Sequence, residues 1–286
     1  GADDAGKFPA NRLALLDSIR RVNSNIVAVI SPDEPCGVPF GKSAAAILLA
    51  GTKDAPGRAA LAAILSGRVC PGGKLAASRY ADAQKYADAL LRGKEEGRFR
   101  IGPFVGYRRD EAENSPAAFP FGHGLSYSSF AYSDLKIQYS SVEATIRNDG
   151  ERDAYETVQL YIGKADSALP RPKKELKGFV KIFLRAGESK TVSFRIPPFT
   201  LEVGHAGGLA VEDGVYEVYV GASSADIRLT GKMRVRGDRF AAGAERSSAY
   251  LRNRSNVLSG NYTFGKVTRA GSRGKGGFFE KYTCYG

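Results

Sequence analysis

Apolar positions near the start of the chain recur with the period of a helix and then give way to short apolar runs. In residues 9–22 an apolar side chain returns every three or four positions, and Pro9 stands in the first turn, where a helix tolerates proline. The repeated positions are Leu13, Leu16, Ile19 and Val22. Residues 26–30 and 44–50 are short, continuously apolar runs, typical of buried parallel strands. The pattern predicts a helix followed by two strands of one parallel sheet.

Two alanine-rich segments continue this alternation of helix and strand. Residues 58–66 and 82–92 are predicted helices, and Gly67 and Gly93 follow them as left-handed C-terminal caps. Alternation of this kind over residues 1–130 predicts a layered α/β domain. A complete doubly wound sheet normally has more than two strands, so we expect this domain to be truncated at its N-terminal side.

From residue 131 the period of the apolar pattern changes from helical to two. Alternating segments are separated by turn signals such as Asn-Asp-Gly, Ala-Gly-Glu and Glu-Asp-Gly. The segments cover residues 142–147, 157–162, 190–196 and 215–220. Short strands at regular spacing predict an immunoglobulin-like β-sandwich over residues 131–236.

The last fifty residues, 237–286, show no clear period and are strongly basic. They hold nine Lys or Arg against three Asp or Glu, in a chain whose net charge is +12. We expect this Gly-, Arg- and Tyr-rich tail either to be solvated or to dock on a partner, forming a homo-oligomer or larger assembly. Interleaved aromatic and basic residues also occur in nucleic-acid binders, but no recognised nucleic-acid fold accompanies them, which disfavours that class. No apolar run approaches the roughly 20 residues of a membrane-spanning helix.

The cysteines and the N-glycosylation sequons indicate the cellular compartment of the protein and whether it holds a metal or cofactor. The spacing of Cys36, Cys70 and Cys284 suits no zinc site, and the glycine-rich residues 271–277 lack the spacing of a phosphate-binding loop. We expect neither metal nor cofactor. Sequons at Asn253 and Asn261 favour a secreted glycoprotein, in which a Cys36–Cys70 disulfide is one open possibility.

Several motifs in one fixed order resemble glycoside hydrolase family 3. Residues 67–78, GRVCPGGKLAAS, resemble that family's G-x-x-x-P-x-G-K-L-P-x-S/T segment, and residues 105–108 resemble its V-G-Y-R. Residues 119–130, FPFGHGLSYSSF, resemble its F-P-F-G-x-G-L-S-Y-T-x-F. Further matches at residues 148–150, 158–161, 171–179 and 186–188 resemble the fibronectin type III-like domain that closes many such enzymes.

The resemblance implies a retaining β-glucosidase or β-xylosidase. Such enzymes use two carboxylates about 5 Å apart, one as nucleophile and one as acid/base. The nucleophilic Asp belongs to an N-terminal barrel that this chain does not contain. The acid/base Glu commonly stands in a G-E-G-x-D-R loop before the first helix, and Gly1 matches the second glycine, so we expect this Glu to lie just before residue 1.

Acidic residues within the chain are weaker catalytic candidates. Asp3 and Asp4 lie near the expected acid/base loop, although Asp4 stands where the family has Arg. Asp33 and Glu34 follow the first predicted strand, at the carboxyl edge where α/β sites usually lie. Lys53 and Asp54 depart from the family's G-x-E-G-G pattern, which weakens the case for an intact sugar pocket. Solvated loop acids are the simpler interpretation of all these side chains.

His123 and Ser126 raise the question of a serine hydrolase. They lie three residues apart in a turn, and the chain has no G-x-S-x-G elbow. By the resemblance, this stretch lies where the α/β layer meets the sandwich. We therefore interpret Phe121, His123 and Tyr127 as junction residues, with Phe119 and Leu125 packing beside them.

Three functional hypotheses remain open. In the first, the chain is the C-terminal part of a family 3 β-glycosidase, inactive alone, which completes the active site of a barrel carried elsewhere. In the second, it is an inactive structural subunit whose basic tail binds neighbouring subunits. In the third, it is a carbohydrate-binding module, which the absence of Trp makes the weakest of the three.

Overall fold

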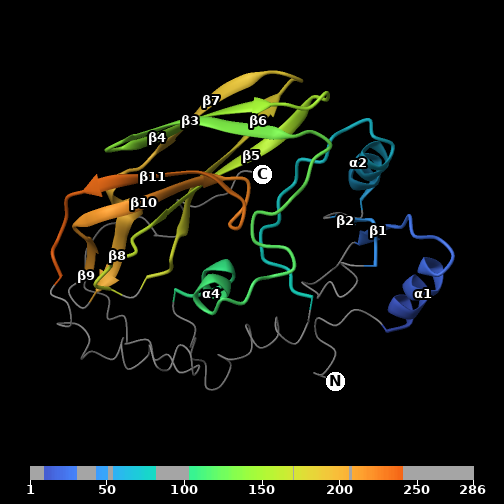
Figure 1. Ribbon diagram of the computed structural model, residues 1–286, viewed down its shortest axis with the longest axis horizontal. Coiled ribbons are helices and arrows are strands. Elements are labelled where there is room, and N and C mark those ends of the chain that lie inside the picture. Colours follow the sequence, from blue (N-terminus) through green and yellow to red (C-terminus); the bar gives the residue numbers. More distant parts are fainter. Residues whose placement is uncertain are drawn as a thin grey trace.

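The computed structural model describes residues 10–30, 43–50, 54–81, 103–169, 171–205 and 208–240. It contains an α/β segment and a β-sandwich, which lie side by side in Figure 1. Several sequence predictions fall outside the described residues. These are the helix at 82–92, the candidate acids Asp3, Asp4, Asp33 and Glu34, Lys53, the cysteines Cys36 and Cys284, the sequons at Asn253 and Asn261, and the tail beyond residue 240.

The α/β segment begins with helix α1 (Ala10–Arg20), followed by β1 (Val27–Ile30) and β2 (Ala46–Leu49). The two strands pair in parallel, with Val27 opposite Ala46 and Ile30 opposite Leu49, as the sequence predicted. Helix α2 (Ala55–Leu65) follows. It begins earlier than predicted because the Asp54 carboxylate caps it, accepting a hydrogen bond of 2.9 Å from Gly57 N.

One prediction about this segment is wrong in part. The apolar runs predicted strands buried on both faces, yet the side chains of Val27 and Val29 are 49% and 42% exposed. The opposite face of the two-stranded sheet is covered, because Ala28, Ile30 and their neighbours on β2 pack against α1 and Phe119. Within the part of the chain that the structure describes, one face of this sheet is therefore apolar and uncovered.

The sandwich consists of two antiparallel sheets. One has the order β3-β4-β7 and the other β11-β10-β5-β6. The strands are β3 (Phe130–Gln138), β4 (Ser141–Asn148), β5 (Ala154–Gly163), β6 (Glu175–Leu184), β7 (Ser189–Arg195), β10 (Gly214–Gly221) and β11 (Ile227–Val235). A 3-10 turn, η2 (Pro198–Leu201), leads into the small hairpin of β8 (Glu202–His205) and β9 (Gly208–Val211). The predicted fold class, an α/β segment followed by an immunoglobulin-like sandwich, is confirmed.

The hydrophobic core of the described chain lies between these two sheets. Alternate residues of β4, β5 and β10 point inward and are almost fully buried. Those less than 2% exposed include Ile146, Leu160, Tyr216, Val142, Val158, Val218 and Val220. In contrast, neither α1 nor α2 contains a buried residue. Among the described residues the sandwich therefore has a complete core, whereas the α/β segment has only the small cluster around Ile30. No described helix has the length and apolar character that crossing a membrane requires.

Asn148, in the first turn signal of the sandwich, is fully buried and fully hydrogen-bonded. Its amide nitrogen donates to Arg152 O (2.8 Å) and Leu184 O (3.1 Å). Its amide oxygen accepts from the Ser128 hydroxyl (2.6 Å) and Gly150 N (3.0 Å). This side chain joins the turn to two other parts of the sandwich.

Replacing Asn148 with alanine is expected to lower the free energy of unfolding by roughly 2–4 kcal/mol, because buried donors and acceptors lose their partners. Urea titration followed by circular dichroism measures this loss. The neighbouring change Asp149→Ala is the control: its ion pair with Arg147 is exposed and contributes about 0.5 kcal/mol or less. Equal losses for the two variants would contradict the assignment.

Candidate functional site

The motifs that carry the family resemblance meet where the α/β segment contacts the sandwich. Residues 73–75 run beside residues 122–124, and we call these two segments the junction. Leu75 N donates to His123 O (2.8 Å), and Gly122 N donates to Leu75 O (2.7 Å). The Lys74 ammonium group donates to Gly124 O (2.9 Å). The PGGKL and FPFGHGLSY motifs thus form one paired unit of backbone.

Two positions of the FPFGHGLSY motif require glycine, because other parts of the chain come very close to their backbone. Gly122 has a φ of +79°, and a Cβ there would overlap the side-chain amide of Gln159 on β5. A Cβ on Gly124 would overlap the carbonyl oxygen of Gly73. Only glycine fits both the backbone conformation and the space at Gly122.

Gln159 fixes the junction to the sandwich. Its amide nitrogen donates to Gly122 O (3.2 Å) and to Ala222 O (2.7 Å), and its amide oxygen accepts from the Tyr161 hydroxyl. Ser224 N also donates to Phe121 O (3.0 Å). Gln159 lies within a family motif, but the sequence did not indicate its role; the available signal is an amide side chain flanked by the apolar and aromatic residues Val158, Leu160 and Tyr161.

A short helix, α4 (Tyr107–Ala112), forms the second contact between the two parts. The Tyr107 ring stacks on Phe121 with centroids 5.0 Å apart and meets Tyr161 edge-on at 5.8 Å. The Tyr107 hydroxyl accepts a hydrogen bond from Leu176 N (2.8 Å). Glu111 pairs with Lys174. The VGYR motif therefore packs directly on residues 174–176 of the RPKKELKGF motif.

His123 and Tyr127 lie at this contact in different ways. The His123 ring is half-buried against Phe119, with centroids 5.4 Å apart. Tyr127 is about half-exposed, but its hydroxyl donates to Ile64 O of α2 (2.9 Å). Leu125 was expected to pack between the domains, which is wrong, because its side chain is 77% exposed. Phe121 and Tyr127 make the contact through their side chains, and Gly122 and His123 make it through backbone groups.

The environment of His123 favours its neutral form. Burial lowers the pKa of this imidazole and the nearby Lys74 ammonium lowers it further, while Asp226 partly opposes both effects. The unfolded chain therefore takes up a proton near pH 6.5, at a pH where the folded chain does not.

Stability is accordingly expected to rise with pH between the lowered pKa of folded His123 and about 6.5, and to fall on acidification through that window. Urea midpoints measured at intervals from pH 5 to pH 8 detect the slope. Replacing His123 with glutamine should remove the part of the slope that this group contributes. An identical pH profile in the variant would show that other groups cause it.

Two buried carboxylates in the described chain are each held in a structural network. Glu156 accepts from the Tyr132 hydroxyl (2.7 Å) and faces the Lys74 ammonium at 3.3 Å. Glu212 accepts from the Ser167 hydroxyl (2.6 Å) and from Ala168 N (2.7 Å). Neither resembles a free catalytic acid, because each oxygen has a hydrogen-bond donor or cation as its partner.

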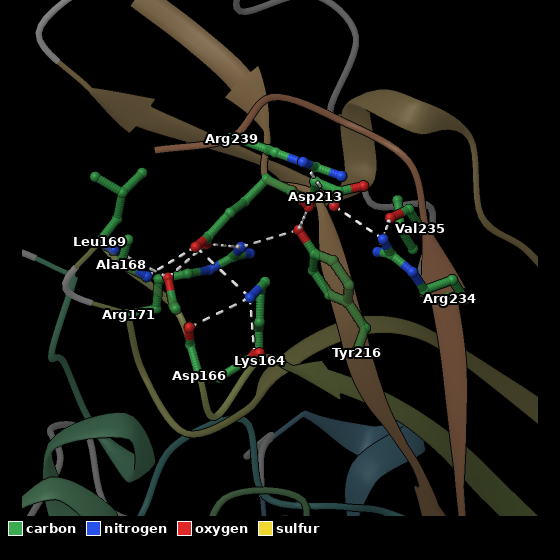
Figure 2. Close-up of polar contacts among 12 residues, drawn as sticks. Lys164, Asp166, Ala168, Leu169, Arg171, Asp213, Tyr216, Arg234, Val235 and Arg239 are labelled. Carbon is green, nitrogen blue, oxygen red and sulfur yellow. Dashed lines mark hydrogen bonds and ion pairs between the residues drawn. The ribbon is translucent and has the colours of Figure 1, made fainter. Parts of the chain in front are cut away.

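The polar contacts around Glu212 join the loop of Lys164 and Arg171 to Tyr216 of β10, and these three labelled side chains lie together in Figure 2. The Glu212 carboxylate faces the buried Lys164 ammonium at 3.6 Å and the Arg171 guanidinium at 3.9 Å. Tyr216 donates its hydroxyl to Glu212 O (2.9 Å) and accepts from Arg171 (3.3 Å). The sequence did not predict this cluster, because its members lie in the loop between β5 and β6, in the turn before β10 and in β10 itself.

Only some of the remaining predicted site residues lie within the described part of the chain. Cys70 is buried and carries a free thiol, and the possible pairing with Cys36 stays a prediction because Cys36 lies outside the described residues. Within the described ranges no three His, Cys, Asp or Glu side chains gather as a metal site. The catalytic candidates Asp3, Asp4 and Glu34 also remain predictions.

Comparison with known proteins accounts for this arrangement of motifs. The family described as "Glycosyl hydrolase family 3 C-terminal domain" matches residues 2–127, and the "Fibronectin type III-like domain" matches residues 156–224. Exo-alpha-(1->6)-L-arabinopyranosidase of Bifidobacterium longum is 38% identical over 82% of this chain and 32% of its own length. Thermostable beta-glucosidase B of Acetivibrio thermocellus is 35% identical over 80% of this chain and 32% of its own length.

Solved structures agree with these matches. The GH3 beta-glucosidase of Bifidobacterium adolescentis superposes with a TM-score of 0.74 at 33% identity, over 85% of this chain and 38% of that protein. Beta-glucosidase 3B of Thermotoga neapolitana, in complex with alpha-D-glucose, gives a TM-score of 0.75 at 29% identity, over 82% and 35%. The chain thus spans about a third of the length of these relatives. It belongs to glycoside hydrolase family 3, of which it carries a C-terminal portion with the fibronectin type III-like domain.

Proposed function

We propose that the chain serves as the C-terminal part of a retaining β-glycosidase and acts only with the rest of the enzyme. The substrate class is a terminal β-linked glucose or xylose. In this mechanism one carboxylate attacks the anomeric carbon, and a second protonates the leaving oxygen and later activates water. Under this proposal both the nucleophile and the acid/base carboxylate lie outside this chain. The chain then contributes a neighbouring domain to the enzyme rather than its catalytic carboxylates.

The observation that carries the proposal is the match to family 3 over most of this chain and only a third of its relatives. The described residues agree with a supporting role. Their buried carboxylates, Glu156 and Glu212, are neutralised by Lys74 and by Lys164 with Arg171. The polar groups of the junction likewise bond to one another and hold the α/β segment on the sandwich.

Hydrolysis of 4-nitrophenyl glycosides tests this proposal. The chain alone is expected to release no nitrophenol from the β-D-glucoside, the β-D-xyloside or the α-L-arabinopyranoside. Adding a separately expressed fragment of the Bifidobacterium longum relative, covering its sequence outside the matched region, should produce hydrolysis.

Hydrolysis by the chain alone would overturn the proposal and direct attention to Asp3, Asp4 and Glu34, whose amide variants would then be assayed. A stable complex that hydrolyses none of the three glycosides would instead favour the structural role.

A further inference from the structure

The outer face of β5 and β6 carries three exposed aromatic side chains. Tyr155 stands opposite Phe183, and Phe179 lies on the same face of β6, opposite Gln159. The Tyr155 and Phe183 rings are in contact, with centroids 5.1 Å apart and planes inclined by 57°. Phe179 is 63% exposed, Tyr155 45% and Phe183 37%. We call Tyr155, Phe179 and Phe183 the aromatic patch.

Polar side chains stand between the rings of the aromatic patch. Lys181 and Thr157 face each other across the two strands, with Phe179 on one side and the Tyr155–Phe183 pair on the other. The Lys181 ammonium lies 5.1 Å from the centre of the Tyr155 ring. The ammonium group donates hydrogen bonds, and the threonine hydroxyl both donates and accepts them. Ring faces and hydrogen-bonding groups therefore alternate along this surface.

The rings follow the direction of β6. Phe179 and Phe183 are four residues apart in a regular part of the strand, which separates their Cα atoms by about 13 Å. That span is longer than a single sugar ring and is within reach of a short oligosaccharide. Among the described residues β6 is an edge strand, with β5 as its neighbour, so the patch borders solvent along one side.

The size of the aromatic patch disfavours a second protein chain as its occupant. At these exposures the three side chains present roughly 300 Å² of accessible surface. A stable protein interface needs about 800 Å² from each partner. Lys181 also disfavours the addition of another strand, because lysine on an edge strand opposes such pairing. Exposed apolar patches of this size are often functional, and a small ligand matches this one in extent.

We propose that the aromatic patch binds a short β-linked oligosaccharide of glucose or xylose. A pyranose ring has faces of C–H groups, which stack on the electron-rich faces of aromatic rings, and a rim of hydroxyl groups. Sugar rings stack on Phe179 and on the Tyr155–Phe183 pair, and hydroxyl groups between them bond to Lys181 and Thr157. Tyr and Phe supply the ring faces in a chain without Trp.

The inference rests on the proposed function for the choice of sugar. It adds that the fibronectin type III-like domain itself holds the glycan. The patch requires no catalytic carboxylate, so the chain alone binds the oligosaccharide without cleaving it.

Isothermal titration calorimetry of the full chain with cellotetraose and xylotetraose tests the proposal. At least one of them should bind, and glucose and xylose should bind at least tenfold more weakly, because a monosaccharide reaches only one end of the patch. Maltotetraose, whose α-linkages curve the chain, should also bind at least tenfold more weakly. Binding of neither β-linked tetraose overturns the proposal, as does equal binding of maltotetraose or of the monosaccharides.

Phe179→Leu is the informative variant, and Phe199→Leu is its matched control. Phe199, in η2, is 64% exposed, close to the 63% of Phe179. Leucine keeps an apolar side chain but has no ring face, so Phe179→Leu should weaken tetraose binding at least fivefold, whereas Phe179→Tyr should keep it. Phe199→Leu should leave the affinity unchanged, and all three variants should melt like the original chain. Equal affinities of Phe179→Leu and Phe199→Leu would overturn the proposal.

Amide NMR spectra of the nitrogen-labelled chain locate the ligand without any substitution. The bound tetraose should shift the signals of residues 155–157 and 179–183 more than those of β4 and β7, which belong to the other sheet. Shifts confined to other segments would contradict the proposed location.

The remaining outcomes identify a different occupant or separate this inference from the proposed function. A dimer of the free chain that Phe179→Leu dissociates would assign the patch to a second copy. Loss of tetraose binding when the complementary fragment of the Bifidobacterium longum relative is added would assign the patch to a contact within the hydrolase. Either result overturns the inference. Tetraose binding by a chain whose complex hydrolyses no glycoside supports the inference and contradicts the proposed function, and hydrolysis by a complex whose chain binds no tetraose does the reverse.

Discussion

Replacing Glu212 with alanine is expected to lower the free energy of unfolding by about 3–5 kcal/mol, because the change leaves buried cations without their counter-charge. The side chains of Lys164 and Arg171 are almost fully buried beside the carboxylate. The same change removes the acceptor of the Ser167 hydroxyl and of Ala168 N. Since small domains are stable by only about 5–15 kcal/mol, a loss of this size brings the sandwich close to unfolding.

Urea titration followed by circular dichroism measures this effect. Asp213→Ala is the matched control, because Asp213 is the next residue and pairs with Arg234 and Arg239 at the surface. Its removal should change the urea midpoint little, since exposed ion pairs contribute little. A Glu212→Ala midpoint equal to that of Asp213→Ala would show that the buried cations find other partners.

Within the sandwich, the strands that the sequence predicted are those with uninterrupted alternation. β4, β5, β7 and β10 were expected from their period, whereas β3, β6 and β11 were not. In β3 the pairing shifts between Ser133 and Lys136, and Asp134 has a φ of +52°, so the period breaks. In β6 and β11 a glycine stands within the strand: Gly178 faces the Phe194 ring, and Gly231 lies against Ile137. Each glycine leaves room for a side chain of the facing sheet. The pattern of residues within one strand carries no information about that side chain.

At the junction, too, the sequence predicted the motifs but not the contacts between them. The resemblance identified the FPFGHGLSY and VGYR motifs and placed the first of them between the domains. It could not show that Tyr107 stacks on Phe121 or that Gln159 binds Gly122 O, because these contacts join segments far apart in the chain. Likewise, the apolar runs of β1 and β2 indicated burial on both faces, and the described chain covers only one of them. Burial of the second face needs a packing partner, and the sequence of the two strands does not identify that partner.

Gly122→Ala is expected to cost about 3–5 kcal/mol and to release the α/β segment from the sandwich. An alanine at a φ of +79° costs about 1–2 kcal/mol through its backbone alone. The remainder arises because the new Cβ displaces the Gln159 amide, whose hydrogen bonds to Gly122 O and Ala222 O are then lost.

Gly187→Ala isolates the backbone part of that cost. Gly187 has a φ of +76°, and a Cβ there would meet nothing within 4 Å. We therefore expect a loss of about 1–2 kcal/mol for Gly187→Ala, measured by urea titration. Limited proteolysis adds a second readout, in which Gly122→Ala should expose residues 103–127 to cleavage before the sandwich, and Gly187→Ala should not. Equal losses of stability with equal cleavage would mean that Gly122 is required only for its φ and that Gln159 does not hold the two parts together.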